Sequence, residues 1–282
     1  MLAIIAYFWV VDIQTKVPVQ IKQNCSLEIK QFMGRNLFIV TPKNKEKTKT
    51  KILYFHGGSY VAEATKQHWD FIEKIVNDSG ATVILPDYPL TPKYNYKHVF
   101  QMVVPLYKEI IEVVNQEDLI IMGDSAGGGL ALALEEKVGE EKLPMPSKTI
   151  LISPWLDVRM ENPKIDEVQK KDKQLNKETL KLAGIAYAGE DGINSYLVNP
   201  IEGDLSKLKN LTIFTGTHDI LNPDVHVLNE KAKKVGVNIE IKEYEQAKHI
   251  WVIDKNSGKT LEQQAYQEIM ATLGQAQTDH KW

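Results

Sequence analysis

The sequence predicts an α/β fold in which helices cover both faces of a mostly parallel central sheet. From Lys51 onward, short apolar β-branched runs alternate with longer segments of helical periodicity, which is the pattern of strands joined by crossover helices. The composition agrees, because 43% of the 282 residues are hydrophobic and 25% are charged. Such a chain can bury a large core, and disordered, collagen-like and membrane-bundle proteins are excluded.

Six runs have the length and composition of strands, and each is followed by a polar or glycine-bearing loop. They are Ile52–Phe55, Thr82–Leu85, Leu119–Met122, Thr149–Ile152, Leu211–Phe214 and Ile239–Tyr244.

Two of the expected helices connect the first three of these strands. Residues 69–76 place apolar side chains on one helical face, and Ser79-Gly80 ends that helix. Residues 99–114 form another apolar stripe, and Pro105 within it predicts a kink or a helix that starts late.

An antiparallel hairpin is expected at the edge of the sheet. Val19–Ile29 and Leu37–Val40 have strand character and flank the turn-like segment 32–36. The following run, Lys43–Lys51, contains no aromatic residue that could stack on a base, and we interpret it as a solvated loop.

A long insertion separates two predicted strands, from Asp157 to about Pro200. Its first part, Val168–Lys177, is charged, and Glu178–Ala188 has helical character. Long insertions in compact domains are often lids. We therefore expect one domain over residues 1–282, with cap elements at about 1–17 and 157–200.

The apolar run Leu2–Val11 has no Lys or Arg before it and no small-residue cleavage site after it. Ten residues are too few to cross a hydrocarbon core of ~30 Å. We interpret the run as a cover for an apolar surface, and specifically as a wall of the active site.

The net charge and the cysteine content restrict the binding partners and the cellular location that the sequence predicts. Lys and Arg number 34 against 37 acidic residues, a net charge of -3, so we expect no nucleic-acid partner and no membrane insertion. The only cysteine, Cys25, cannot form an intrachain disulfide or a cysteine-rich metal site. A reducing, cytoplasmic location fits this usage.

The strongest motif is GDSAGG, residues 123–128, between a predicted strand and the helix-forming segment 130–138. In a G-x-S-x-G elbow the serine occupies a strained bend, and the glycines let strand and helix approach each other. Ser125 is the candidate nucleophile. The N-terminus of the following helix, with the Ala126 amide, favours negative charge there.

Two alternatives for this motif fit less well. The spacing is neither G-x-G-x-x-G nor that of a lysine-bearing phosphate loop. GDSGG also occurs in trypsin-like proteases, but those are all-β proteins whose histidine precedes the serine.

A base and an orienting acid follow the serine in the order Ser, Asp, His that α/β-hydrolases use. Asp219 lies just past the strand Leu211–Phe214, and His249 lies just past the strand that ends near Tyr244. Loops at the carboxyl ends of parallel strands meet at one edge of a sheet. His56-Gly57-Gly58-Ser59-Tyr60 follows an earlier strand and supplies a candidate oxyanion loop.

With these motifs the chain resembles the α/β-hydrolase carboxylesterases of the bacterial hormone-sensitive-lipase group, from about Leu53 to Trp251. The resemblance implies Ser125 as nucleophile, His249 as base and Asp219 as orienting acid. It further implies an oxyanion hole made of the amides of Gly58, Ser59 and Ala126, with His56 organising the loop. The motifs are HGGSY (56–60), DYPLTP (87–92), GDSAGG (123–128), SPWLD (153–157), Asp219–Asp224 and His249.

The chain departs from the family pattern at four places. Ser59 replaces a third glycine, and Lys93 replaces a glutamate that could form an ion pair. Ile250-Trp251 replaces a common Gly-Phe and is expected to narrow the pocket. Only 55 residues precede His56, which implies a reduced cap.

Other residues have weaker functional interpretations. His218 and His226, with Asp219, have neither helical zinc-site spacing nor a third ligand, so we expect no metal and no cofactor. Asp224 is either an N-terminal helix charge or a hydrogen-bond partner of the acid loop. Three further histidines are interpreted as surface or capping residues: His68, His98 and His280. Four aromatic residues are core residues first and acyl-pocket candidates second: Tyr60, Trp155, Tyr187 and Trp251.

The sequence therefore predicts a serine carboxylesterase that hydrolyses small or short-chain esters with water through an acyl-enzyme. Amidase, peptidase or deacetylase activity with the same triad, and a non-catalytic small-ligand binder on the same fold, are the alternatives. A homodimer is left open.

Overall fold

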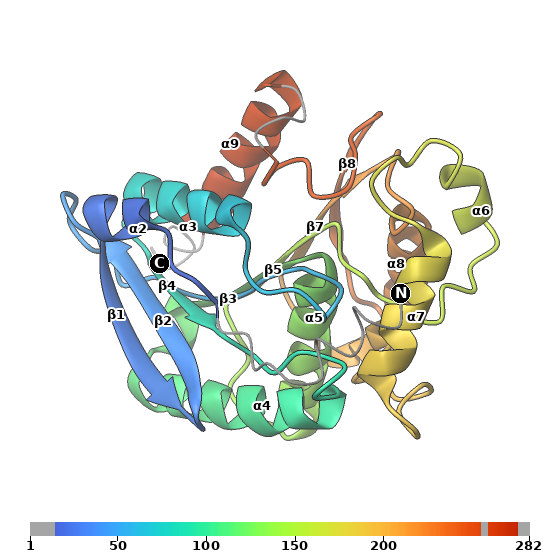
Figure 1. Ribbon diagram of the computed structural model, residues 1–282, viewed down its shortest axis with the longest axis horizontal. Helices are drawn as coiled ribbons and strands as arrows, with labels where there is room; N and C mark the ends of the chain where they lie inside the picture. The colour runs from blue at the N-terminus through green and yellow to red at the C-terminus, as the bar shows by residue number, and fades with distance from the viewer. Residues whose placement is uncertain (1–14, 255–258, 276–282) are drawn as a thin grey trace.

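The computed structural model describes residues 15–254 and 259–275, and an eight-stranded sheet forms the centre of this part (Figure 1). The strand order is β1-β2-β4-β3-β5-β6-β7-β8. β1 pairs with β2, and β2 with β4, in antiparallel orientation, and every later pair is parallel. The strands are β1 (Cys25–Phe32), β2 (Arg35–Pro42), β3 (Lys51–Phe55), β4 (Thr82–Pro86), β5 (Leu119–Asp124), β6 (Lys148–Ile152), β7 (Leu211–Gly216) and β8 (Glu240–Tyr244).

All six strands predicted from Ile52 to Tyr244 are present, with ends that differ by at most two residues. β4, β5 and β7 are buried along their whole length, as expected for parallel strands covered on both faces. The edge strand β8 instead carries Glu240, Lys242 and Glu243, and charged side chains disfavour pairing with another chain.

Helices cover the two faces of the sheet and divide the core into two clusters. α4 (Tyr96–Val113), α5 (Ser125–Glu140) and α8 (Asn222–Lys234) contribute to one cluster, and α3 (Lys66–Ser79) and α9 (Lys259–Gln275) contribute to the other. In Figure 1, α3 and α9 lie on the opposite side of the sheet from α4.

The helix ends follow local chemistry. Gly80, with φ 77°, ends α3 as expected. α4 starts at Tyr96, so of the two outcomes that Pro105 predicted, the late start was wrong. The side chain of Asn95 caps its first turn by accepting a hydrogen bond from the N–H of Lys97, and Pro105 lies inside the helix.

The predicted hairpin is present, but its first strand is shorter than expected. Residues 19–24 form the helix α2 (Val19–Asn24), and the strand begins at Cys25. Pro18 precedes the helix with φ -61°, and Ile21 alone of the six helical residues is buried. A single buried side chain can anchor a helical turn as well as a strand, so the strand predicted over Val19–Ile29 was wrong for residues 19–24.

The segment between β6 and β7 contains α6 (Ile165–Val168) and α7 (Lys177–Ala188), and α7 coincides with the predicted helix. The same segment also contains the 3₁₀ turns Pro200–Glu202 and Leu205–Lys207, and a further 3₁₀ turn, Gln116–Asp118, precedes β5. The run Leu2–Val11, and with it most of the expected N-terminal cap element, lies outside the described residues. Among the described helices, none combines the length and apolar character that a bilayer span requires.

Candidate active site

Ser125 occupies the sharp turn between β5 and α5. Its φ of 52° lies in the left-handed region, which few non-glycine residues adopt. A Cβ on Gly123 would lie 2.4 Å from the Gly127 carbonyl oxygen, and one on Gly127 would lie 2.0 Å from that of Phe55. The two glycines therefore permit the close approach of strand, helix and neighbouring loop that holds Ser125 at the edge of the sheet.

His249 joins Ser125 to Asp219. The Nε2 atom of His249 lies 2.9 Å from Ser125 Oγ, and Nδ1 lies 2.9 Å from Asp219 Oδ2. Because a carboxylate only accepts, Nδ1–H donates to Asp219 and leaves Nε2 to accept the Ser125 hydroxyl proton. The three side chains that the sequence singled out are thus brought into one hydrogen-bonded chain.

The loops that carry Asp219 and His249 are bonded to each other. The N–H of Thr217 donates to the Tyr244 carbonyl and the N–H of His218 to the Ala247 carbonyl. The N–H of Leu221 donates to Asp219 Oδ1 at 2.9 Å. Asp219 is fully buried, so its carboxylate has little freedom to rotate.

The surroundings of His249 raise its pKa. Burial lowers the pKa, but the charge of Asp219 and its hydrogen bond outweigh burial, and Asp172 and Asp124 act in the same direction. These groups stabilise the imidazolium, which is the form that exists after proton transfer from a serine.

The HGGSY loop lies beside Ser125. A Cβ on Gly57 would be 2.9 Å from Ser125 Cβ, and one on Gly58, where φ is 122°, would be 2.7 Å from the Ala62 carbonyl oxygen. Gly57 N–H is occupied by Asp124 Oδ2 at 3.1 Å. Over the described residues, the N–H groups of Gly58 and Ser59 have no acceptor.

Ser59 stands where the family pattern has a third glycine, and its backbone adopts a conformation that glycine favours. Its φ of 54° is left-handed, and the next residue, Tyr60, has φ 61°. The Ala126 N–H belongs to the first turn of α5, where amides have no partner within a helix. The three predicted oxyanion donors therefore lie on the two backbone segments that flank Ser125.

Sequence reasoning missed a buried network under this loop. Asp124 is fully buried and accepts hydrogen bonds from Tyr54 Oη at 2.6 Å, from Gly57 N–H and from His68 Nε2 at 3.1 Å. The Thr65 N–H donates to Nδ1 of His68, so the proton of that ring is on Nε2. Burial raises the pKa of Asp124, but His68 and these hydrogen bonds outweigh it and hold the pKa below its ordinary value.

His68 is therefore not a surface residue, although it does cap a helix, as expected. His98 caps α4 in the same way. His280 lies outside the described residues. His56 stacks on Tyr88 at 4.5 Å, and burial, the largest influence, lowers its pKa to about 4.

The aromatic candidates are core residues. Tyr60 stacks on Tyr187 of α7 with a centroid distance of 3.6 Å and on Trp155 at 5.7 Å, and all three are at most 1% exposed. Trp251 packs against Tyr244 in the cluster that contains α3 and α9. Trp251 is thus part of the core on the face of the sheet that α3 and α9 cover.

The remaining candidates have local partners. Asp224 lies in the first turn of α8 and accepts from Asn162 Nδ2 at 2.8 Å, so its helix-charge interpretation fits better than a bond to the acid loop. His226 Nε2 lies 2.8 Å from Glu243. Lys93 lies over the Tyr94 ring at 5.1 Å. No group of three potential metal ligands is found within residues 15–254 and 259–275.

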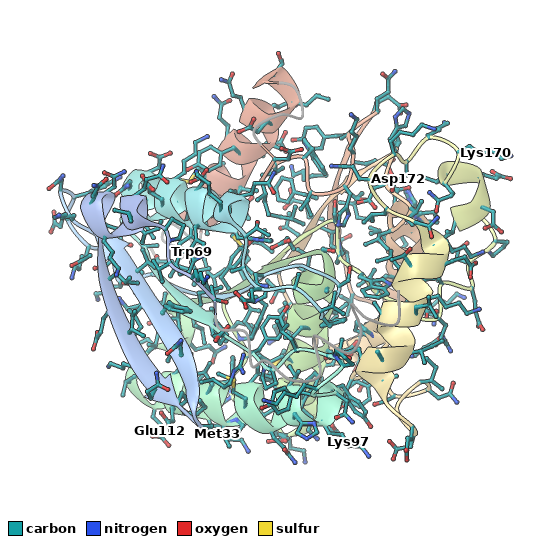
Figure 2. The ribbon with its side chains drawn as sticks, in the orientation of Figure 1. Met33, Trp69, Lys97, Glu112, Lys170 and Asp172 are labelled. Carbon is teal, nitrogen blue, oxygen red and sulfur yellow. The ribbon has the colours of Figure 1, made fainter. Side chains whose placement is uncertain are left out.

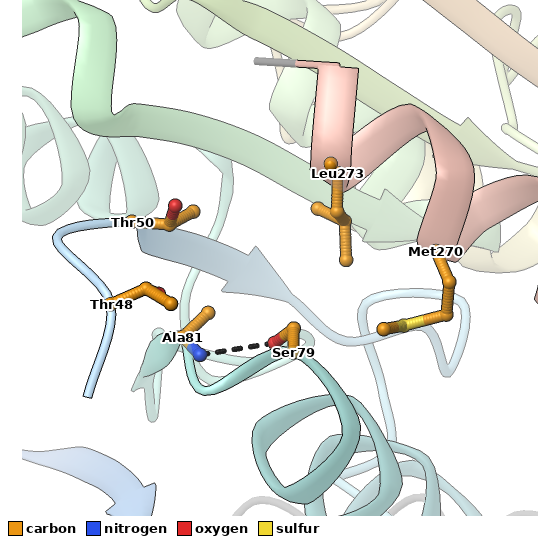
Figure 3. Close-up of a pocket in the computed structure, with 7 residues that line it drawn as sticks. Thr48, Thr50, Ser79, Ala81, Met270 and Leu273 are labelled. Atoms are coloured by element: carbon orange, nitrogen blue, oxygen red, sulfur yellow. Dashed lines mark hydrogen bonds between the residues drawn. The ribbon is translucent and has the colours of Figure 1, made fainter. Parts of the chain in front are cut away.

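A small cavity at the other end of the sheet is separate from this site. Thr48 and Thr50 precede β3, Ser79 and Ala81 precede β4, and α9 closes the cavity with Met270, Leu273 and Gly274 (Figure 3). The cavity therefore lies at the amino ends of β3 and β4, whereas Ser125 follows the carboxyl end of β5.

Known proteins resemble the chain over the region that contains the site. The model of a family described as alpha/beta hydrolase fold matches residues 52–253. An esterase of Acinetobacter venetianus is 31% identical over 68% of this chain and 64% of its own length, so the chain spans less than two thirds of that relative. An acetyl-hydrolase of Streptomyces hygroscopicus is 28% identical over 71% of this chain and 67% of its own.

A solved structure extends the resemblance to most of the chain. A hormone-sensitive lipase from a metagenome library superposes with a TM-score of 0.83 at 25% identity. The superposition covers 90% of this chain and 87% of the other. The fold class expected from the sequence is thereby confirmed.

Proposed function

Because this chain belongs to the alpha/beta hydrolase fold family, we propose that it is a serine carboxylesterase that hydrolyses small or short-chain carboxylic esters through an acyl-enzyme. The observation that carries the proposal is the hydrogen-bonded chain from Ser125 Oγ through His249 to Asp219, with both distances at 2.9 Å. The esterase and acetyl-hydrolase named above support the same class of reaction.

In the first half of the reaction, Ser125 Oγ attacks the ester carbonyl carbon while its proton moves to His249 Nε2. The carbonyl electron pair moves to oxygen, where the N–H groups of Gly58, Ser59 and Ala126 stabilise the anion. The intermediate collapses, the ester C–O bond breaks, and His249 gives its proton to the leaving alcohol.

In the second half, water attacks the acyl-enzyme and passes a proton to His249. A second tetrahedral anion forms, and the same three N–H groups stabilise it. It collapses with Ser125 Oγ as the leaving group, and the serine regains its proton from His249. Asp219 holds Nδ1–H throughout and stabilises the imidazolium. The products are a carboxylic acid and an alcohol.

The stack of Tyr60, Trp155 and Tyr187 supports a preference for small acyl groups. A Cβ on Gly129, one turn of α5 past Ser125, would lie 3.0 Å from Tyr60 Oη and 2.2 Å from the Trp155 carbonyl oxygen. The side of α5 one turn past the nucleophile is therefore closed by the Trp155 backbone and by the buried Tyr60 side chain. We include α6 and α7 in a reduced cap over the site.

An acyl-length series of p-nitrophenyl esters, from acetate to palmitate, tests the substrate class. We expect kcat/KM to be highest for the shortest chains and to fall steeply as the chain lengthens. A maximum at long chains would overturn the small-ester proposal.

Tyr187→Ala provides the internal comparison, because it removes one layer of the stack. In this variant, the ratio of kcat/KM for the longer esters to that for acetate should rise. Leu182→Ala on the exposed side of the same helix is the control and should keep the wild-type ratio.

A further inference from the structure

We propose that Asp172 is a positioning residue of this site, which fixes the loop that carries Asp219 and adds a buried negative charge near His249. It belongs to the insertion between β6 and β7, in the loop from α6 to α7. The proposal deepens the function proposed above and rests on it.

The carboxylate of Asp172 joins two segments of the chain. Oδ2 accepts a hydrogen bond from the N–H of Ile220 at 3.0 Å, across 48 residues of sequence. Oδ1 accepts from the N–H groups of Gln174 at 2.8 Å and Leu175 at 2.9 Å. Hydrogen bonds to an ionised acceptor are stronger than neutral ones, so this side chain ties the insertion firmly to the acid loop.

Ile220 is the residue directly after Asp219, and its position bears on the catalytic acid. Asp219 Oδ1 accepts from the N–H of Leu221, so consecutive amides of this loop are held by two different carboxylates. Loss of the Asp172 contact would free the Ile220 amide and let the loop shift. A displacement of about 1 Å in a reacting group can cost about a hundredfold in rate.

The charge of Asp172 also bears on His249. Asp172 is only 4% exposed, and its partners within the described residues are backbone N–H groups, so no ion pair neutralises it there. The acidic groups that act on His249 are Asp219, Asp172 and Asp124. Asp172 thus stabilises the imidazolium that forms when Ser125 gives up its proton.

The neighbours of Asp172 have a different environment. Lys170, Lys171 and Lys173 are exposed, and Figure 2 shows Lys170 at the outer rim near α6, with Asp172 on the inner side of the insertion. A charged side chain is rarely buried unless it is paired or hydrogen-bonded, so Asp172, the buried residue of this charged run, has a specific structural role.

The test compares Asp172→Asn with Asp166→Asn. Asparagine keeps an oxygen for the Gln174 and Leu175 amides but removes the charge and the acceptor for Ile220. Asp166 lies in the same insertion, is 65% exposed and pairs with Lys177, so it controls for a general effect on the insertion. We measure kcat and KM for p-nitrophenyl acetate across pH, with thermal unfolding in parallel.

For Asp172→Asn we expect kcat to fall roughly tenfold or more, with little change in KM, from loss of positioning. The acid limb of the pH profile should move to lower pH, because removal of a negative charge lowers the pKa of His249. Asp166→Asn should match wild type in both. If Asp172→Asn kept the wild-type kcat and the wild-type position of the acid limb, the proposal would be overturned. A lower melting temperature in that variant would then indicate only a structural role for Asp172.

Two further measurements cover a variant that does not fold. Asp172→Ser retains an oxygen for the turn amides and lacks the charge, so it should show the same two changes. In the wild-type protein, the Ile220 amide should be protected from hydrogen exchange, and exchange at the rate of a free amide would contradict the proposal. If the wild-type protein does not hydrolyse p-nitrophenyl acetate, the esterase function is refuted. If it does, and Asp172→Asn hydrolyses the ester as well as wild type, only the role of Asp172 is refuted.

Discussion

His249 Nε2 lies 2.9 Å from Ser125 Oγ although 124 positions separate the two residues in the chain. The contact exists because β5 and β8 end at the same edge of the parallel part of the sheet, with β6 and β7 between them. A catalytic pair of this kind belongs to the whole sheet, so the strands that separate the two residues are as necessary as the residues themselves.

The pH dependence of activity follows from this pair. His249 must be neutral to accept the Ser125 proton, and its pKa lies above the ordinary 6.5 because Asp219, Asp172 and Asp124 outweigh burial, which alone would lower it. Activity is therefore lost as pH falls through the raised pKa. We expect kcat/KM for p-nitrophenyl acetate to rise with pH and to reach half its maximum above pH 6.5. A midpoint clearly below that value would contradict the described surroundings of His249.

Asp219→Asn should lower kcat by about 10⁴-fold, because asparagine can donate to Nδ1 and favour the wrong tautomer of His249. The fold should be preserved, since the amide has the shape of the carboxylate. Asp224→Asn, five residues away in the first turn of α8, is the matched control and should stay within a few-fold of wild type. Equal losses in both variants would argue that the loop as a whole, and not the carboxylate of Asp219, is what matters.

His68→Ala should destabilise the protein by about 1–3 kcal/mol more than His98→Ala, as measured by denaturant unfolding. Both histidines cap a helix from its third position, but only His68 also donates to the buried Asp124. The substitution leaves that carboxylate without one of its donors. Because Asp124 also holds the Gly57 amide, kcat should fall in His68→Ala alone. Equal effects of the two substitutions on stability would mean that the Asp124 contact contributes nothing.

Stability should also depend on Glu135, a fully buried residue of α5. Burial, the largest influence, raises its pKa from the ordinary 4.5 to about 7. The folded state therefore binds the proton more tightly than the unfolded state, and this stability is present below about pH 4.5 and lost as pH rises through about 7.

Glu135→Gln should remove that part of the pH dependence. The variant should gain stability relative to wild type at about pH 8, on the order of a few kcal/mol, with little gain at about pH 4. Melting temperatures at the two pH values provide the measurement, with the exposed Glu112→Gln as the control. A constant difference at both pH values would show that Glu135 does not titrate in this range.

The strands and the triad could be predicted from the sequence because both depend on local patterns. β3 to β7 are short, mainly apolar runs bounded by turn residues, β8 is a short strand with Ile and Tyr among charged residues, and Ser125, Asp219 and His249 each follow one of these strands. Parallel strands then bring the three residues to one edge. The errors were also local: the strand expected over Val19–Ile29 begins only at Cys25, and the cap that Asn95 provides before α4 went unnoticed.

Asp172 and His68 could not be identified as site residues in the same way. Asp172 reaches Ile220 across 48 residues and His68 reaches Asp124 across 56, and neither belongs to a motif with a known spacing. Asp172 stands in a lysine-rich run that has the composition of a solvated loop. Burial of one charge in such a run depends on tertiary packing, which composition does not encode.

The most direct test of the central claim is the hydrolysis of p-nitrophenyl acetate by purified Ser125→Ala, with fluorophosphonate labelling of the wild-type protein. The account predicts a fall in kcat of at least about 10⁴-fold in a variant that folds normally, and covalent labelling of the wild type on Ser125 alone. Wild-type hydrolysis by Ser125→Ala, or an active protein whose Ser125 stays unlabelled, would contradict it.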